Sequence, residues 1–154
     1  MARAGRIPLG YFDDADATQK TFPEVGGQRV VIAGDRGLLA PDGTLRLLGR
    51  DSLVVNTGGE KVFVEEVEEV LRAHPDIADA LVVGRPSEQW GSEVVAIVQL
   101  ADGATASDQD LLDEAIKHIA RYKLPKAFVY RSALVRSPAG KADYRWARDQ
   151  AIEG

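Results

Sequence analysis

The sequence predicts an α+β fold in which helices pack on a small central sheet. Stretches of alternating or continuously apolar residues are interspersed with stretches whose apolar residues recur at helical spacing. Turns rich in Gly and Pro separate the two kinds of stretch. The chain has 154 residues. This length suits one ordinary core, or a domain of about 100 residues with an appendage.

The first 50 residues predict a short β-rich segment. Residues 5–24 are rich in Gly, Pro, Asp and Thr and predict a loop with one short helix near 15–22. Three β-type runs follow, at 29–33, 37–40 and 44–48. The turn Pro41-Asp42-Gly43 joins the last two as a hairpin, so we expect a small antiparallel sheet.

A domain boundary is expected at 49–52, where Gly, Arg, Asp and Ser interrupt the pattern. We therefore divide the chain into 1–50 and 51–154. A strand at 53–56 opens the second part, and a helix is expected over 64–73. Its inner face would carry Val64, Val67, Val70 and Leu71, with Glu65, Glu66, Glu68 and Glu69 facing outward.

The rest of the second part predicts sheet and helix in alternation. Residues 77–83 and 94–100 are almost continuously apolar, as in strands covered by helices. Ser107 or Asp108 can cap a helix that continues to about Arg121. The expected inner face of that helix is Leu111, Leu112, Ala115, Ile116 and Ile119. A strand at 126–131 and a terminal helix at 144–152 complete the pattern.

Composition excludes several classes of protein. The chain is 45% hydrophobic and 28% charged, and it has no apolar run near the roughly 18 residues that a membrane span needs. Its N-terminus lacks the apolar core of a signal peptide, so a cytoplasmic location is expected. The absence of Cys excludes disulfides and thiolate metal sites, and His74 and His118 are too far apart in sequence to indicate a zinc site. We expect no metal ligand in this chain.

Charge points to a small polyanion as ligand. Between residues 117 and 148 there are nine Lys or Arg and one acidic residue, although the net charge of the chain is -5. No nucleic-acid-binding motif is present, so a nucleotide or coenzyme A fits better than nucleic acid. A solvated basic face is the simpler alternative.

Two short segments could carry chemistry. Lys141 follows Pro138 and Gly140 on a turn, from which an ammonium group can reach an anion without unwinding a helix. The pair Gly58-Gly59 follows a strand and permits a ligand or another backbone to approach closely. The alternative for Lys141 is an exposed turn without a ligand, and the alternative for Gly58-Gly59 is a tight hairpin turn.

Together these segments resemble the C-terminal end of AMP-forming acyl-CoA synthetases. Pro138, Gly140, Lys141 and Arg145 match the superfamily's final motif, and 49–69 resembles the motif that begins Gly-Arg and contains Gly-Gly-Glu. The resemblance implies that Lys141 is the catalytic lysine of adenylation and that Arg50 lies near the nucleotide. It also implies that Gly58, Gly59 and Lys61 border the path of coenzyme A.

The resemblance extends to earlier residues, with departures. Asp35 matches the aspartate that accepts hydrogen bonds from the ribose of ATP, although Ala33 stands where Thr is usual. Ser52 stands at the hinge, where the family usually has Asp or Lys, and it cannot form a salt bridge there. We interpret Trp90 as a packing residue. Lys123 and Lys126 are interpreted as structural or electrostatic.

These motifs imply the C-terminal part of a fatty acid (or related carboxylate)–CoA ligase, most similar to actinobacterial enzymes for fatty acids or steroid side chains. ATP, coenzyme A and a small carboxylic acid would be the substrates, and Mg²⁺ would accompany ATP without a ligand from this chain. A missing N-terminal domain would complete the enzyme, so this chain alone would be inactive. The alternatives are an enzyme that loads a carrier protein and a stand-alone module that binds a nucleotide or a partner.

Overall fold

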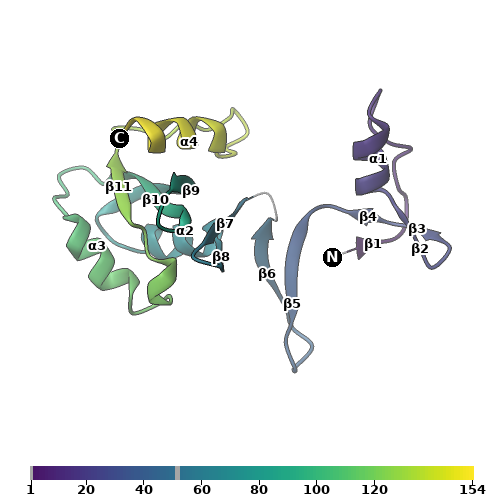
Figure 1. Cartoon of the computed structure of the whole chain (residues 1–154), viewed down its shortest axis with the longest axis horizontal. Coiled ribbons are helices and arrows are strands. Elements are labelled where there is room, and N and C mark those ends of the chain that lie inside the picture. The colour runs from purple at the N-terminus through teal and green to yellow at the C-terminus, as the bar shows by residue number, and fades with distance from the viewer. Residues whose placement is uncertain (1, 51–52) are drawn as a thin grey trace. The chain divides into compact units, whose positions relative to one another are not determined.

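The computed structural model describes the backbone of residues 2–50 and 53–154, and the side chains of 2–45 and 53–154. It contains two compact units, Met1–Ser52 and Leu53–Gly154. Figure 1 shows the elements of each unit.

The first unit consists of short paired strands and one helix. The helix α1 (Ala15–Thr21) begins after Asp14, whose side chain accepts a hydrogen bond from the N–H of Ala17. The pairs are antiparallel: β1 (Ala2–Arg3) with β4 (Val31–Ile32), β2 (Glu24–Val25) with β3 (Gln28–Arg29), and β5 (Asp35–Leu39) with β6 (Leu45–Arg50).

The hairpin predicted around Pro41-Asp42-Gly43 is confirmed as β5 and β6. The single strand expected at 29–33 is wrong, because the chain splits there into β3 and β4, which pair with different partners. Several large apolar side chains of this unit are exposed, with Phe12 fully so and Leu9 at 92%. Two-stranded pairs of this length bury little surface by themselves.

The second unit is built around a three-stranded sheet in the order β11-β10-β9. The strand β9 (Ile77–Ser87) pairs antiparallel with β10 (Gly91–Leu100), and β10 pairs parallel with β11 (Ala127–Tyr130). A separate hairpin comprises β7 (Val54–Thr57) and β8 (Glu60–Phe63). The helices are α2 (Val64–Arg72), α3 (Asp108–Ala115) and α4 (Tyr144–Glu153), and the short 3₁₀ helix η2 is Arg121–Lys123.

Both faces of the sheet are covered, which explains why its strands are continuously apolar. Ala80, Val82 and Val98 belong to a cluster with residues of α2 and α3. Leu81 and Ile97, which alternate with them, belong to a cluster on the other face together with residues of α4. Figure 1 shows α4 on the opposite side of the sheet from α2 and α3. The predicted α+β arrangement of sheet and helices is confirmed.

The helix expected over 107–121 is shorter than predicted. It begins with a capping box between Ser107 and Asp110 and ends at Ala115. The amides of Lys117 and His118 then bond to carbonyls only three residues back, which tightens the chain into a turn. As a result Ile116 does not reach the inner face and is 38% exposed.

Glu68 lies inside the protein, contrary to the expectation that it faces outward. It is four residues beyond Val64, so it shares the inner face of α2. Its carboxylate accepts hydrogen bonds from Val82 N–H (2.9 Å), the Tyr144 hydroxyl (3.2 Å) and Arg72 (3.3 Å). These bonds replace water, and Glu68 is 3% exposed.

Candidate functional site

The Gly58-Gly59 turn joins β7 to β8. Both glycines have positive φ, +55° and +88°, which is the conformation of a tight two-residue hairpin turn. The N–H of Gly58 donates a hydrogen bond of 3.0 Å to the carbonyl of Trp90, in the turn between β9 and β10. A Cβ on Gly58 would lie 3.1 Å from Trp90 Cε3. Gly58 therefore needs both its freedom of φ and its lack of a side chain.

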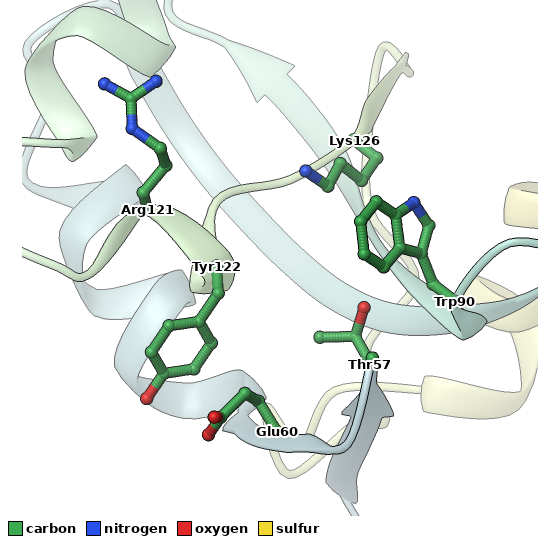
Figure 2. A pocket seen from close by; sticks show the side chains of 7 residues that line it. Thr57, Glu60, Trp90, Arg121, Tyr122 and Lys126 are labelled. Carbon is green, nitrogen blue, oxygen red and sulfur yellow. The ribbon is translucent and has the colours of Figure 1, made fainter.

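A hollow of about 410 Å³ opens beside this turn, as Figure 2 shows. Its walls come from the β7–β8 hairpin, the β9–β10 turn, η2 and Lys126, the residue before β11. The lining residues are Thr57, Gly58, Glu60, Trp90, Arg121, Tyr122 and Lys126. Segments distant in the sequence thus meet at one place.

One cation, Lys126, faces an aromatic ring, Trp90, in the hollow. The Nζ of Lys126 lies 5.5 Å from the centre of the Trp90 ring, within the range of a cation–π contact. Trp90 and Tyr122 are 39% and 42% exposed. Exposed aromatic faces can stack on a planar ring, and Arg and Lys side chains bind phosphates. The hollow therefore suits a ligand that has both a planar ring and phosphate groups.

An ion pair holds one wall of the hollow in place. The Lys123 Nζ lies 2.7 Å from both carboxylate oxygens of Glu66 on α2. Lys123 belongs to η2, which also carries Arg121 and Tyr122. The pair therefore ties η2 to α2.

Sequence reasoning missed part of this site. Trp90 was expected only to pack, and it does contact Gly58, but it also lines the hollow. Arg121 carries no prediction beyond its place in the basic stretch 117–148, and Tyr122 carries none. The available signal was the basic stretch around 117–126, in which Tyr122 interrupts the cations. Gly59 and Lys61 do not line the hollow, and Lys61 is exposed on β8 opposite Asn56.

Lys141 lies at the end of a hydrogen-bonded turn. The Lys141 N–H donates to Ser137 Oγ (3.2 Å), and the Lys141 carbonyl accepts from Ser137 N–H (2.8 Å). Gly140, at φ +77°, donates from its N–H to the Ser137 carbonyl (2.8 Å). The side chain of Lys141 is exposed and has no hydrogen bond or ion pair within the part of the chain that the structure describes. Lys141 does not line the hollow.

Asp35 and Arg50 both lie in the first unit. They face each other as partners in the β5–β6 ladder. Asp35 is half-buried. The Arg50 side chain and the whole of Ser52 lie outside the described residues. The structure thus brings the backbones of Asp35 and Arg50 together.

No group of three or more His, Cys, Asp or Glu among residues 2–50 and 53–154 could hold a metal ion. None of the helices described is long and apolar enough to cross a membrane.

Comparison with known proteins gives the family. Residues 66–141 match the AMP-binding enzyme C-terminal domain. The chain is 55% identical over 154 residues to a medium-chain acyl-CoA ligase of Mycobacterium avium, covering 100% of this chain and 28% of the relative. It is 49% identical over 150 residues to a 3-oxocholest-4-en-26-oate–CoA ligase of Rhodococcus rhodochrous, covering 97% of this chain and 27% of the relative.

Solved structures agree with this likeness. The o-succinylbenzoate CoA synthetase of Bacillus subtilis, solved with an acyl-adenylate intermediate, superposes with a TM-score of 0.80 at 31% identity. The superposition covers 95% of this chain and 28% of that one. Residues 66–141 therefore carry an AMP-binding enzyme C-terminal domain, and the chain is similar over nearly its whole length to part of the acyl-CoA ligases.

Proposed function

We propose that this chain is the C-terminal part of an AMP-forming ligase that joins a fatty acid or a steroid side-chain acid to coenzyme A. The likeness to a medium-chain acyl-CoA ligase over 100% of this chain carries the proposal. In such a reaction a carboxylate attacks the α-phosphate of ATP and releases pyrophosphate. The thiol of coenzyme A then attacks the acyl-adenylate, and AMP leaves with formation of the thioester.

Lys141 serves the first half-reaction in this proposal. Negative charge builds between the carboxylate and the α-phosphate, and a nearby ammonium stabilises it. Two features support the role: the hydrogen-bonded turn fixes the backbone of Lys141, and its exposed ammonium has no hydrogen bond or ion pair among the residues described. The cation is thus available to a phosphate.

The hollow beside Gly58 serves the second half-reaction. Coenzyme A combines an adenine ring, phosphates and a narrow pantetheine arm. The rings of Trp90 and Tyr122 can stack on adenine, and Arg121 and Lys126 can bind phosphate. Gly58 and Gly59 carry no side chain to obstruct the arm, and the exposed Lys61 lies on the adjoining strand.

The same proposal assigns roles to Asp35, Arg50 and Ser52. Asp35 would accept hydrogen bonds from the ribose hydroxyls of ATP, and Arg50 would lie near the nucleotide. Ser52 would stand at the hinge between the two half-reactions. Mg²⁺ bound with ATP would offset phosphate charge and would take its ligands from outside this chain.

The test separates the two half-reactions in the longer ligase of which this chain would be the C-terminal part. Lys141→Ala should slow formation of acyl-adenylate from ATP and acid about 100- to 1,000-fold, the effect of losing one preorganised charge-stabilising group. Thioester formation from supplied acyl-adenylate should change little. An equal loss in both would contradict the role of Lys141.

Two further measurements test which molecule accepts the acyl group and whether this chain is active by itself. Acyl transfer to a carrier protein but not to coenzyme A would favour the carrier-loading alternative. The 154-residue chain alone, incubated with ATP, coenzyme A and fatty or steroid acids, should release no AMP. AMP release that depends on this chain would show that it is not merely a part of the ligase.

A further inference from the structure

The turn that carries Lys141 is attached to the central sheet by one arginine. Arg136 donates two hydrogen bonds to Asp79 on β9, Nε to Oδ2 and Nη2 to Oδ1, both at 2.8 Å. A planar guanidinium and a carboxylate pair in this two-bond geometry with a defined orientation. The pair is partly covered, with side-chain exposures of 34% for Arg136 and 20% for Asp79.

The same guanidinium also holds the turn itself. Arg136 Nη1 donates a hydrogen bond of 3.1 Å to the carbonyl of Gly140, the residue before Lys141. Arg136 and Ala142 form an isolated antiparallel bridge, so the two ends of the turn lie side by side. One side chain thus connects the sheet to the peptide unit that leads into Lys141.

The ionisation of the pair agrees with this attachment. Burial of Asp79 opposes its charged form, but hydrogen bonds from Arg136 and from Ala80 N–H outweigh burial and hold the pKa of Asp79 below its ordinary value. The hydrogen bond from Arg136 to Asp79 raises the pKa of Arg136. Both partners therefore stay charged at neutral pH.

A second contact fixes the chain on the far side of Lys141. Tyr144 opens α4 and donates its hydroxyl to the buried Glu68 at 3.2 Å. The segment between Arg136 and Tyr144 is thus attached at both ends to the core, while the ammonium of Lys141 remains exposed.

We propose that Arg136 is a positioning residue for Lys141: paired with Asp79 and bonded to the Gly140 carbonyl, it fixes the turn that presents the ammonium. This inference rests on the proposed function of Lys141 in adenylation. Arg136 acts through the backbone and need not touch a substrate. Its loss leaves the charge of Lys141 in place but lets the group move, and a displacement of about 1 Å can cost on the order of 100-fold in rate.

The chain offers a matched control in Arg85. Its guanidinium also bonds a carboxylate of the sheet, Glu93, at 2.9 Å and 2.8 Å, and donates to a backbone carbonyl, that of Ala151, at 3.1 Å. The exposures of that pair, 27% and 19%, resemble those of Arg136 and Asp79. Arg85 however holds the C-terminal end of α4, away in sequence from the Lys141 turn.

In the longer ligase, Arg136→Ala should slow adenylate formation about 10- to 100-fold. The KM for ATP and the rate of thioester formation from supplied acyl-adenylate should stay within about twofold. Arg136→Lys should behave like Arg136→Ala, because one ammonium cannot make the fork to Asp79 and also hold Gly140. Arg85→Ala should leave the ratio of the two half-reactions unchanged. If Arg136→Ala does not fold, Asp79→Asn takes its place with the same expectation.

Equal slowing of both half-reactions by Arg136→Ala, or slowing of neither, would overturn the inference. A second readout does not depend on activity: amide hydrogen exchange at Ser137 and Gly140 in the present chain. It should speed up in Arg136→Ala and not in Arg85→Ala, and equal exchange in both would also overturn the inference. If Lys141→Ala shows no selective loss while exchange responds as expected, the proposed function fails and the attachment of the turn stands.

Discussion

The carboxylate of Glu68 and the backbone N–H of Val82 are joined by a buried hydrogen bond of 2.9 Å between α2 and β9. The other carboxylate oxygen is bonded by Tyr144 and Arg72. Burial is the largest influence on this group and raises the pKa of Glu68 above its ordinary value of 4.5, against the opposing effect of its hydrogen bonds and of Arg72.

Glu68→Gln should therefore change how stability depends on pH. With a raised pKa the folded state binds the proton of Glu68 more tightly than the unfolded state does. The tighter binding of this proton stabilises the folded state. The stabilisation is fully present below pH 4.5 and is lost as pH rises through the pKa of Glu68 in the folded state. Across that interval the slope is about 1.4 kcal/mol per pH unit at most. Gln cannot titrate, so the variant should lack this slope.

Urea unfolding at a series of pH values would measure the slope. The exposed neighbour Glu69, changed to Gln, is the control, since it lies on the outer face of α2. The prediction would be contradicted if the free energy of unfolding of Glu68→Gln depended on pH in the same way as that of the unsubstituted chain above pH 4.5.

Gly58→Ala should destabilise the chain more than Gly59→Ala does. Both positions have positive φ, so each substitution costs about 1 kcal/mol in backbone strain. Only at Gly58 does the added methyl group meet the Trp90 ring, at 3.1 Å, whereas nothing lies within 4 Å at Gly59. Crowding of this kind adds roughly 1 kcal/mol or more.

Denaturant unfolding of both variants would give this difference. Tryptophan fluorescence adds a direct readout of Trp90 when Trp146→Phe serves as the background, because the chain has two Trp residues. Equal stability of the two glycine variants and an unchanged spectrum would show that the ring yields without cost.

Lys123→Met should weaken coenzyme A binding although Lys123 does not line the hollow. The substitution releases η2, and with it Arg121 and Tyr122, from Glu66. We expect about a 1.5- to 5-fold loss of affinity, measured by calorimetry, which corresponds to the roughly 0.2–1 kcal/mol typical of such pairs. Lys117→Met is the matched control: it removes the same charge and breaks a pair with Glu114 at the end of α3.

Glu66→Gln distinguishes positioning from simple charge attraction. Removing a negative charge would strengthen phosphate binding if long-range charge alone mattered. If Glu66 acts by holding Lys123, its loss weakens binding as Lys123→Met does. Higher affinity in Glu66→Gln would therefore contradict the prediction.

Ser107→Ala should destabilise the second unit by about 1 kcal/mol. The Ser107 hydroxyl accepts from Asp110 N–H, and the Asp110 carboxylate accepts from Ser107 N–H at 2.9 Å. Losing a capping side chain leaves helix N–H groups unpaired. Thermal unfolding would measure the loss, and Ser107→Thr, which keeps the hydroxyl, should lose much less.

Much of the fold of the second unit follows from local sequence. The apolar spacing of α2 and the cap of α3 depend on neighbouring residues, so they could be predicted from the sequence. The end of α3 at Ala115 could not, because no Gly or Pro follows it to mark an end, yet the amides of Lys117 and His118 bond to carbonyls only three residues back. The spacing of Glu68 from Val64 puts it on the inner face of α2, but the partners that make a buried carboxylate tolerable, Val82 and Tyr144, are distant in sequence and could not be predicted.

The candidate site likewise combines features that depend on local sequence with features that depend on tertiary contacts. The α+β pattern, the glycine turn at Gly58-Gly59 and the exposed turn of Lys141 could be predicted from the sequence, because each depends on backbone preferences and local periodicity. The meeting of Gly58, Trp90 and Lys126 around one hollow depends on tertiary packing and could not be predicted. The same holds for the attachment of the Lys141 turn to Asp79 through Arg136. Partners 57 residues apart in the chain can meet only when the packed sheet brings them together, since hydrogen bonds and ring contacts act over a few ångströms.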